Sequence, residues 1–431
     1  MKTKVLMFGW EFPPHISGGL GTASYGLTKG LAKHGVEILF VMPKAGGDED
    51  QSAVKIINAS DVEMLDEYSS REDYWEFVRF IEIGSNLVPY LDPERFEKEA
   101  AAAIRAGGKE QRVTFRNKFR FSGKYGVNLM EEVARYALLA GTIALQEEFD
   151  IIHAHDWLTY TAGIVAKRVS GKPLVVHVHA TEFDRSGENI NQQVYDIERR
   201  GMHAADRVIA VSNLTRNIVI KHYGIAPEKV VTVHNAVDFQ SYKEVTETRG
   251  VPEKVVTFLG RITYQKGPEY FIEAANKVLK HYPNVRFVMA GSGDMLNRAI
   301  RRVAQLKIAT HFHFTGFLRG DDVQRMFAQS DVYVMPSVSE PFGISPLEAM
   351  RSGVPTIISK QSGVSEVLVH SIKVDFWDVD AMADAIYGLL AYPALARVAG
   401  KEGLEEVNRL KWENAAEKVK HVYEEVISPR N

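Results

Sequence analysis

The sequence contains no cysteine among its 431 residues. Disulfide bonds, thiolate nucleophiles and cysteine-ligated metal ions are therefore excluded, and the absence fits a reducing compartment. An excess of charge of one sign is also lacking, because 52 Lys and Arg stand against 55 Asp and Glu, for a formal net charge of −3. Such a chain has no overall positive field to hold nucleic acid or an anionic membrane.

Long hydrophobic runs are missing as well. The apolar run near the N-terminus is followed by Glu11 and two prolines, and it is too short for the hydrophobic region of a signal peptide. No stretch reaches the roughly 18 apolar residues of a membrane-spanning helix. We therefore interpret the N-terminal run as a strand and expect a cytoplasmic protein.

What the sequence does contain is an alternation of short runs rich in Val and Ile with longer amphipathic segments. The short runs are typical of strands buried on both faces of a parallel sheet, and the longer segments are typical of helices. Predicted strands cover residues 4–8, 36–42, 151–154, 174–178 and 207–211, then 255–259, 285–290, 311–314, 332–335 and 356–358. Predicted helices cover residues 22–34, 128–148, 159–169 and 213–223, then 267–281, 294–306, 322–329 and 346–351.

The alternation runs twice, which predicts an α/β protein with two Rossmann-like, doubly wound parallel-sheet domains facing a central cleft. We predict the first domain over residues 1–238, a polar linker over 239–254 and the second domain over 255–408. Residues 409–431 are predicted to form a C-terminal segment with an amphipathic helix over 412–427. Because ligands bind such sheets at the carboxyl ends of their strands, we expect the functional residues there.

One stretch, residues 60–124, interrupts the alternation with charged, irregular sequence. Its basic residues include Arg112, Arg116, Lys118, Arg120 and Lys124. A solvated excursion from the first domain is the simpler interpretation. The alternative is a flap that binds an acceptor or touches a membrane, which we do not favour.

A glycine-rich segment, Ser17-Gly18-Gly19-Leu20-Gly21-Thr22, lies between the first predicted strand and the first predicted helix. Glycines allow close approach of a ligand to the backbone, and a helix N-terminus favours negative charge. Ser24 stands where a dinucleotide-binding fingerprint would have its third glycine, so that motif is only weakly supported. A tight strand-to-helix turn is the alternative.

Two cations follow the first strand of the second domain. Arg261 comes directly after the strand, and Lys266 precedes the next helix. A guanidinium can bind two phosphate oxygens at once, while an ammonium supplies a point charge. The pair is suited to a pyrophosphate and would stabilise a departing nucleoside diphosphate.

Two carboxylates stand eight residues apart in the segment from Ser339 to Met350. Glu340 precedes and Glu348 falls within the predicted helix, and the amides of Gly343 and Ile344 are available to an anion. An alternative role for Glu348 is a capping box with Ser345 as N-cap. That alternative does not explain Glu340.

Histidines two residues apart close two strands of the first domain, at His153 and His155 and at His177 and His179. Residues two apart share one face of a strand. Histidine and aspartate are common metal ligands. Arg and Lys can, however, neutralise phosphates without a metal ion, so we predict no metal. His179 and Asp156 come last in their strands and are expected at the ligand edge.

Taken together, these segments resemble the GT-B glycosyltransferases, and within them the retaining group that includes bacterial glycogen and starch synthases. The resemblance covers nearly the whole chain. It is carried by PPHISGGLG, HAHDW, HVHATE, VHNAVD, FLGRITYQKG, AGSGD and EPFGISPLEAM, in that order.

For the first domain, the resemblance implies that Gly18 and Gly19 approach the donor phosphates and the acceptor. Asp156 would contact sugar hydroxyls, and His179 would contact the transferred sugar at its hydroxymethyl side. Two positions depart from the family pattern: Ile16 stands where lysine is common, and Ala180 stands where asparagine is common. Polymer synthesis is therefore less directly implied than glycosyl transfer.

For the second domain, the resemblance implies that Arg261 and Lys266 bind the pyrophosphate. Glu340 would lie near the transferred sugar, and Glu348 would bind the ribose hydroxyls. The amides of Gly343 and Ile344 would donate to the distal phosphate.

The activity implied is retaining transfer of glucose from ADP-glucose or UDP-glucose to an α-glucan, with no metal or other cofactor. The expected partners are the nucleotide-diphosphate sugar and the glycan acceptor. One alternative is a transferase of the same fold that builds a cell-surface or lipid-linked glycan. Another is a nucleotide-sugar epimerase with a GT-B-like fold, and a third is a non-catalytic nucleotide-sugar binding module.

Overall fold

The computed structural model describes residues 2–15, 19–65, 68, 118–123, 125, 128–237 and 252–428. Gly18, most of the predicted 60–124 insertion and most of the predicted linker lie outside the described residues. By contacts the chain divides into two units. The first comprises Met1–Val178, Gln192–Ile209 and Ala416–Asn431, and the second comprises His179–Asn191 and Ala210–Ala415.

The first sheet has seven strands in the order β3-β2-β1-β4-β5-β6-β7. The pairs of β1 with β2 and β4, of β2 with β3 and of β4 with β5 are parallel. The strands are β1 (Lys4–Phe8), β2 (Glu37–Met42), β3 (Lys55–Asn58), β4 (Ile151–His155), β5 (Leu174–Val178), β6 (Arg207–Ala210) and β7 (Val230–Thr232). The central strands β1, β2, β4 and β5 are almost fully buried, as expected of strands covered by helices on both faces.

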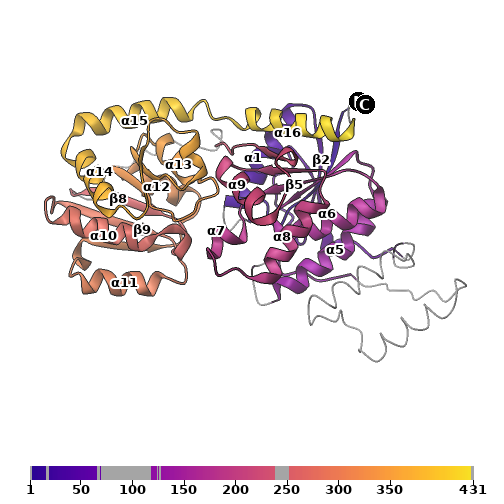
Figure 1. The fold of residues 1–431 in the computed structure, drawn as a ribbon, viewed down its shortest axis with the longest axis horizontal. Coiled ribbons are helices and arrows are strands. Elements are labelled where there is room, and N and C mark those ends of the chain that lie inside the picture. The colour runs from indigo at the N-terminus through magenta and orange to yellow at the C-terminus, as the bar shows by residue number, and fades with distance from the viewer. Residues whose placement is uncertain are drawn as a thin grey trace, which may run out of the picture. The chain divides into compact units, whose positions relative to one another are not determined.

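Helices of the first unit accompany this sheet. They are α1 (Gly19–Lys33), α5 (Leu129–Gln146), α6 (Trp157–Ser170), α8 (Gln192–Ala204) and α16 (Trp412–Ile427). Helices α5 and α6 pack side by side (Figure 1). The C-terminal helix α16 is tied to the sheet by Tyr423, whose hydroxyl lies 2.5 Å from Nδ1 of His153.

The second sheet has six parallel strands in the order β10-β9-β8-β11-β12-β13. The strands are β8 (Lys254–Leu259), β9 (Val285–Ala290), β10 (Phe312–Gly316), β11 (Val332–Met335), β12 (Thr356–Ser359) and β13 (Ile372–Val374). The helices of the second unit are α7 (Glu182–Ser186), α9 (Asn213–Tyr223), α10 (Pro268–Leu279), α11 (Leu296–Gln305), α12 (Asp321–Ala328), α13 (Ser345–Arg351), α14 (Val379–Ala391) and α15 (Pro393–Val407). Short 3-10 helices are η1 (Ala59–Asp61), η2 (Pro227–Lys229), η3 (Tyr264–Lys266), η4 (Ala309–His311) and η5 (Gly363–Glu366).

Each face of the second sheet carries its own apolar core, because successive side chains of a strand point to opposite faces. Val334 of β11 packs with side chains of α10, α11 and α14, whereas Tyr333 and Met335 pack with side chains of α12, α13 and α15. Figure 1 shows α10 and α11 on the side of this sheet away from α15. The predicted class, two α/β domains with parallel doubly wound sheets, is confirmed.

The predicted strands are confirmed with boundaries shifted by at most two residues, and the predicted helices with boundaries shifted by at most three. Several elements were not predicted, including β3, β7 and β13, the short α7, and the helices α8, α14 and α15. Within the part of the chain that the structure describes, no helix combines the length and apolarity needed to cross a membrane.

Candidate functional site

In the second unit, the candidate site lies where the chain leaves β8 and β11. These two strands are neighbours, but the chain continues from β8 towards β9 and from β11 towards β12, on opposite sides. At such a switch point the two following loops diverge and leave room for a ligand. The loops still contact each other, for example where Val338 N–H donates to the carbonyl of Gln265 at 2.9 Å.

Close backbone packing explains two glycines around this edge. Gly267 has φ +63°, and a Cβ there would lie 2.1 Å from the carbonyl oxygen of Pro336. Gly291 has φ +140°, and a Cβ there would lie 1.8 Å from the carbonyl oxygen of Gly260. Any side chain at either position would push apart the loops that carry the predicted site residues.

The structure brings together Lys266 and Glu340, which stand 74 residues apart in the sequence. The Lys266 ammonium donates to Oε2 of Glu340, and the hydroxyl of Ser337 donates to the same oxygen at 3.2 Å. Glu340 is only 6% exposed. A buried carboxylate requires such a counter-charge, and Lys266 neutralises the charge of Glu340 in this structure.

Arg261 is exposed, and within the described ranges its guanidinium makes no ion pair. The side chain of Lys266 lies beside Gly260, the residue before Arg261, since a Cβ on Gly260 would be 3.7 Å from the methylene carbons of Lys266. The two cations predicted to bind pyrophosphate are therefore neighbours. Arg261 is available to an anion, whereas Lys266 is shared with Glu340.

The structure contradicts the capping-box alternative for Glu348. Helix α13 begins at Ser345, its N-cap is Ile344, and no side chain caps it. The hydroxyl of Ser345 instead lies 2.7 Å from the hydroxyl of Tyr333. Desolvation raises the pKa of Glu348 to about 7. Gly343, with φ +99°, and Ile344 directly precede α13. Their amides therefore lie between Glu340 and Glu348 in the chain.

The segment after β5 contributes a carboxylate that the sequence did not single out. Asp184 forms a capping box with Thr181, which donates to Oδ2 of Asp184 through its amide at 2.8 Å and through its hydroxyl at 2.7 Å. The hydroxyl of Ser339 donates to Oδ1 at 2.6 Å. Asp184 thus links the segment that begins at His179 to the residue before Glu340. The T-x-x-D pattern could have indicated the cap, but not the bond to Ser339.

His179 keeps partial exposure, yet desolvation lowers the pKa of its imidazole to about 3. The ring is therefore neutral at physiological pH, and it can donate one hydrogen bond and accept another. A neutral histidine suits contact with sugar hydroxyls better than contact with phosphate.

This lowered pKa predicts an acid-sensitive contribution to stability. The unfolded chain protonates His179 near pH 6.5, whereas the folded state resists protonation to about pH 3, so acid favours unfolding across that window. We expect His179→Gln to reduce the loss of stability between near pH 7 and near pH 5, measured by urea unfolding. The exposed His281, changed to Gln, is the control and should leave the loss unaltered. If the stability of wild type and of His179→Gln changed identically with pH, the lowered pKa of His179 would be contradicted.

In the first unit, three buried histidines lie together. His153 and His155 of β4 and His177 of β5 have ring centroids 4.3 to 5.4 Å apart and interplanar angles of 5° to 26°. Their nitrogens approach within 4.8 Å of one another. A metal requires lone pairs that converge on one point, and nearly parallel rings do not provide this. The arrangement is that of packed core imidazoles.

Asp156 follows β4 with the left-handed φ of +59° and is 8% exposed. Its amide donates to the carbonyl of His177 at 2.9 Å, which places it at the carboxyl end of the sheet. A positive φ is uncommon outside glycine, and such residues cluster at functional sites.

The start of α1 holds a further carboxylate that sequence reasoning missed. Gly19 is the first residue of α1, while Gly18 lies outside the described residues. The amide of Gly21 donates to Oε1 of Glu11 at 3.3 Å, and Glu11 is only 6% exposed. An internal negative charge at this helix N-terminus disfavours a phosphate at the same place.

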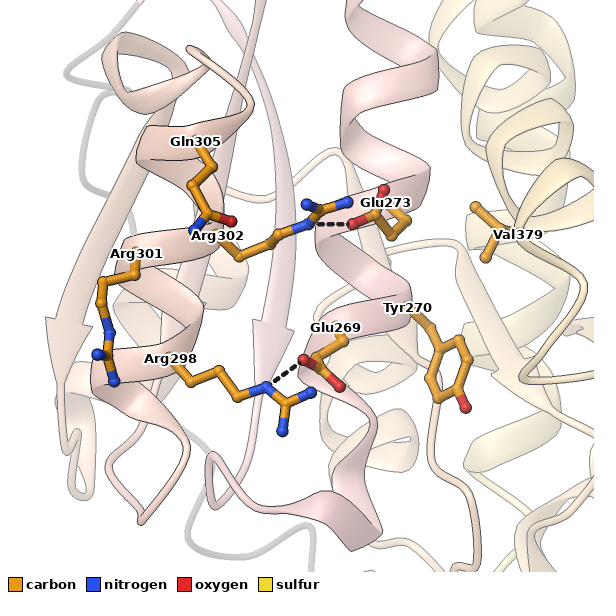
Figure 2. Close-up of a pocket in the computed structure, with 8 residues that line it drawn as sticks. All are labelled: Glu269, Tyr270, Glu273, Arg298, Arg301, Arg302, Gln305 and Val379. Carbon is orange, nitrogen blue, oxygen red and sulfur yellow. Dashed lines mark hydrogen bonds and ion pairs between the residues drawn. The ribbon is translucent and has the colours of Figure 1, made fainter.

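A surface hollow lies between α10 and α11 (Figure 2). Two ion pairs bridge the helices there, from Arg298 to Glu269 and from Arg302 to Glu273, each at 2.6 Å. The opposed charges engage one another across the hollow, as Figure 2 shows. We assign these residues a role in holding α11 against α10.

The family comparisons agree with this geometry. The family described as "Glycosyl transferases group 1" matches residues 243–406, and "Glycosyltransferase Family 4" matches residues 92–241. The α-maltose-1-phosphate synthase of Mycolicibacterium smegmatis is 30% identical over 65% of this chain and 80% of its own length. The chain therefore belongs to the group 1 glycosyltransferases and has the GT-B fold.

Individual relatives cover nearly the whole chain. An uncharacterized glycosyltransferase of Methanocaldococcus jannaschii is 28% identical over 97% of both chains. The glycogen synthase of Mycobacterium tuberculosis is 23% identical over 97% of this chain and 94% of its own. Among solved structures, sucrose-phosphate synthase from Thermosynechococcus elongatus has a TM-score of 0.71 at 18% identity, covering 98% and 99% of the two chains. Anabaena HepE in complex with UDP-glucose has a TM-score of 0.65 at 16% identity, covering the same shares.

Proposed function

We propose that this glycosyltransferase moves glucose, with retention of anomeric configuration, from ADP-glucose or UDP-glucose to an α-glucan. The observation that carries the proposal is the pairing of Lys266 with buried Glu340 beside the exposed Arg261. Cations for a diphosphate thus adjoin a carboxylate for the sugar. The likeness to a glycogen synthase supports the acceptor, and the fold shared with a protein solved with UDP-glucose supports the donor.

In the reaction, the acceptor hydroxyl attacks the anomeric carbon on the face from which the diphosphate departs. The bond between the anomeric carbon and the phosphate oxygen breaks, and the departing oxygen takes the proton of the acceptor. Arg261 and Lys266 stabilise the growing negative charge of the leaving group. Glu340 stabilises the positive charge that develops on the sugar, and neutral His179 holds its hydroxyls.

The remaining predicted residues receive binding roles. Glu348 would accept hydrogen bonds from the ribose hydroxyls, and the amides of Gly343 and Ile344 would donate to the distal phosphate. In the first sheet, Asp156 would contact sugar hydroxyls. The glycine loop, with Gly18 and Gly19, would serve the acceptor more than the donor phosphates, because Glu11 already places a negative charge there.

A donor screen followed by an acceptor screen tests the proposal. Hydrolysis of ADP-glucose and UDP-glucose would be compared with that of other nucleotide sugars, and then transfer to glycogen, maltooligosaccharides and glucose 1-phosphate. We expect glucose donors to be preferred and an α-configured product on a glucan, detected by NMR. Transfer only to glucose 1-phosphate would replace the acceptor, a β-linked product would overturn retention, and release of an epimerised free sugar would overturn transfer.

We expect transfer to survive a chelator, because Arg261 and Lys266 supply the positive charge that a divalent cation would otherwise supply. Activity would be measured after dialysis against EDTA, and again after adding Mg²⁺ or Mn²⁺. Unchanged rates are the expected result. A loss of activity that either ion restores would contradict the metal-independent mechanism.

A further inference from the structure

The carboxylate of Glu366, at the end of η5, bonds to two chain segments far from it in sequence. Oε2 accepts from the amide of Asn213 and Oε1 from the amide of Leu214, each at 2.8 Å. Nε2 of His234 lies 2.7 Å from Oε2. Both oxygens of one side chain are therefore engaged at the start of α9 and at the segment after β7.

These bonds complete the cap of α9. The N-cap residue Ser212 accepts from the amide of Thr215 at 3.0 Å, and Glu366 accepts from the two preceding amides. A negative charge is favoured at a helix N-terminus. Burial would raise the pKa of Glu366, but the bonds from His234 and the two amides outweigh it and lower the pKa below its ordinary value. Glu366 is thus an ionised anchor at neutral pH.

The same short helix backs the loop that carries Glu340. The amide of Gly363 donates to the carbonyl of Glu340 at 2.8 Å, and the amide of Val364 donates to the carbonyl of Phe342 at 2.7 Å. A Cβ on Gly363 would lie 2.1 Å from the carbonyl oxygen of Pro341, so η5 and this loop touch along their backbones. A displacement of η5 must therefore displace Glu340.

We propose that Glu366 is a positioning residue for the glycosyl transfer. It holds η5 on the N-terminus of α9, and η5 in turn holds the backbone of Glu340 in place beside Lys266. The proposal rests on the role proposed above for Glu340. Glu366 itself acts only through this loop and has no contact with substrate in the mechanism.

The test compares Glu366→Gln with a matched control, Glu406→Gln. Glu406 of α15 makes the same kind of anchor, because its oxygens accept from the amides of Val369 at 2.6 Å and His370 at 2.9 Å, with the His370 ring at 3.1 Å. Its bonds hold the chain after η5 and not the Glu340 loop. We expect Glu366→Gln to lower kcat by roughly tenfold or more, the scale of a misplaced catalytic group, while Glu406→Gln retains kcat.

A double-mutant cycle with Glu340→Gln shows whether the effect passes through Glu340. If it does, Glu366→Gln costs little further activity in the Glu340→Gln background. Additive losses, or equal losses in the Glu366→Gln and Glu406→Gln variants, would overturn the proposal. Should Glu366→Gln not fold, His234→Ala removes only one of the three bonds and should show a smaller loss with the same dependence on Glu340.

Hydrogen exchange gives a readout that does not depend on activity. The amides of Gly363 and Val364 should exchange faster in Glu366→Gln than in wild type, and at wild-type rates in Glu406→Gln. Unchanged exchange at both amides would overturn the positioning role. If wild type transferred no sugar, the proposed function would fail, whereas exchange would still decide whether Glu366 holds the Glu340 loop.

Discussion

Replacing Lys266 or Arg261 by alanine should lower kcat/KM for glycosyl transfer by roughly a hundredfold or more, the scale of losing one preorganised charge contact. The physical reason is that the diphosphate departs with increasing negative charge at the end of β8. Arg261→Ala should leave the melting temperature unchanged, because the guanidinium is exposed. Lys266→Ala should also lower the melting temperature, because it leaves buried Glu340 without its cation.

The control for this prediction is a pair of cations in the same unit that hold only surface ion pairs. Lys277 pairs with Asp380 and Arg298 pairs with Glu269. Their alanine variants should keep kcat/KM within about twofold, since exposed ion pairs contribute little. Near-normal turnover by both Lys266→Ala and Arg261→Ala would show that these residues do not bind the leaving group.

Glu348→Gln should weaken binding of the nucleoside diphosphate and remove a pH dependence from it. Wild-type Glu348 has a pKa of about 7, so the ionised form that accepts from ribose hydroxyls is lost as the pH falls below 7. Wild-type affinity should then fall towards the limit of about tenfold per pH unit. The Gln variant should bind weakly at every pH. Calorimetric titration from near pH 6 to near pH 8 measures the affinity of both proteins. The ratio of the two affinities at each pH removes the effect of ionisation of the diphosphate itself.

The same substitution should raise stability at alkaline pH. The folded state of wild type disfavours ionisation of Glu348, so its stability decreases as the pH rises from the ordinary carboxyl value of 4.5 to about 7. Glu348→Gln lacks this loss and should melt at or above the wild-type temperature near pH 8. The exposed Glu405, changed to Gln, is the control for both measurements. Parallel pH profiles of affinity in wild type and Glu348→Gln would rule out the ribose role.

Much of the fold could be predicted because parallel strands buried on both faces are almost continuously apolar. The runs at β1, β5, β9 and β11 were located to the residue. The weaker predictions fall where this signal fades. β3, β7 and β13 are only three or four residues long, and three of the four residues of β3 are half-buried. α14 and α15 have apolar faces but follow no strand that the sequence made plain.

Six of the predicted site residues, Arg261, Lys266, Glu340, Gly343, Ile344 and Glu348, fall at one edge of the second sheet, since the carboxyl ends of parallel strands share an edge. Their chemistry was readable as residue type and spacing. Glu348 shows where such reasoning stops. Its spacing from Ser345 suits a capping box, and only the helix start at Ser345 itself, with the hydroxyl bonded to Tyr333, excludes that role.

The sequence by itself therefore determined the fold class and most of the strands, and it predicted a kind of ligand, because periodicity and residue type are local properties. Only the tertiary structure decided which charges meet. Lys266 reaches Glu340, Asp184 accepts from Ser339, and Glu366 accepts from Asn213 and Leu214, across separations of 74, 155 and about 150 residues. These contacts carry no local pattern, because they depend on the order in which strands lie side by side in the sheets and on which loops that order brings together.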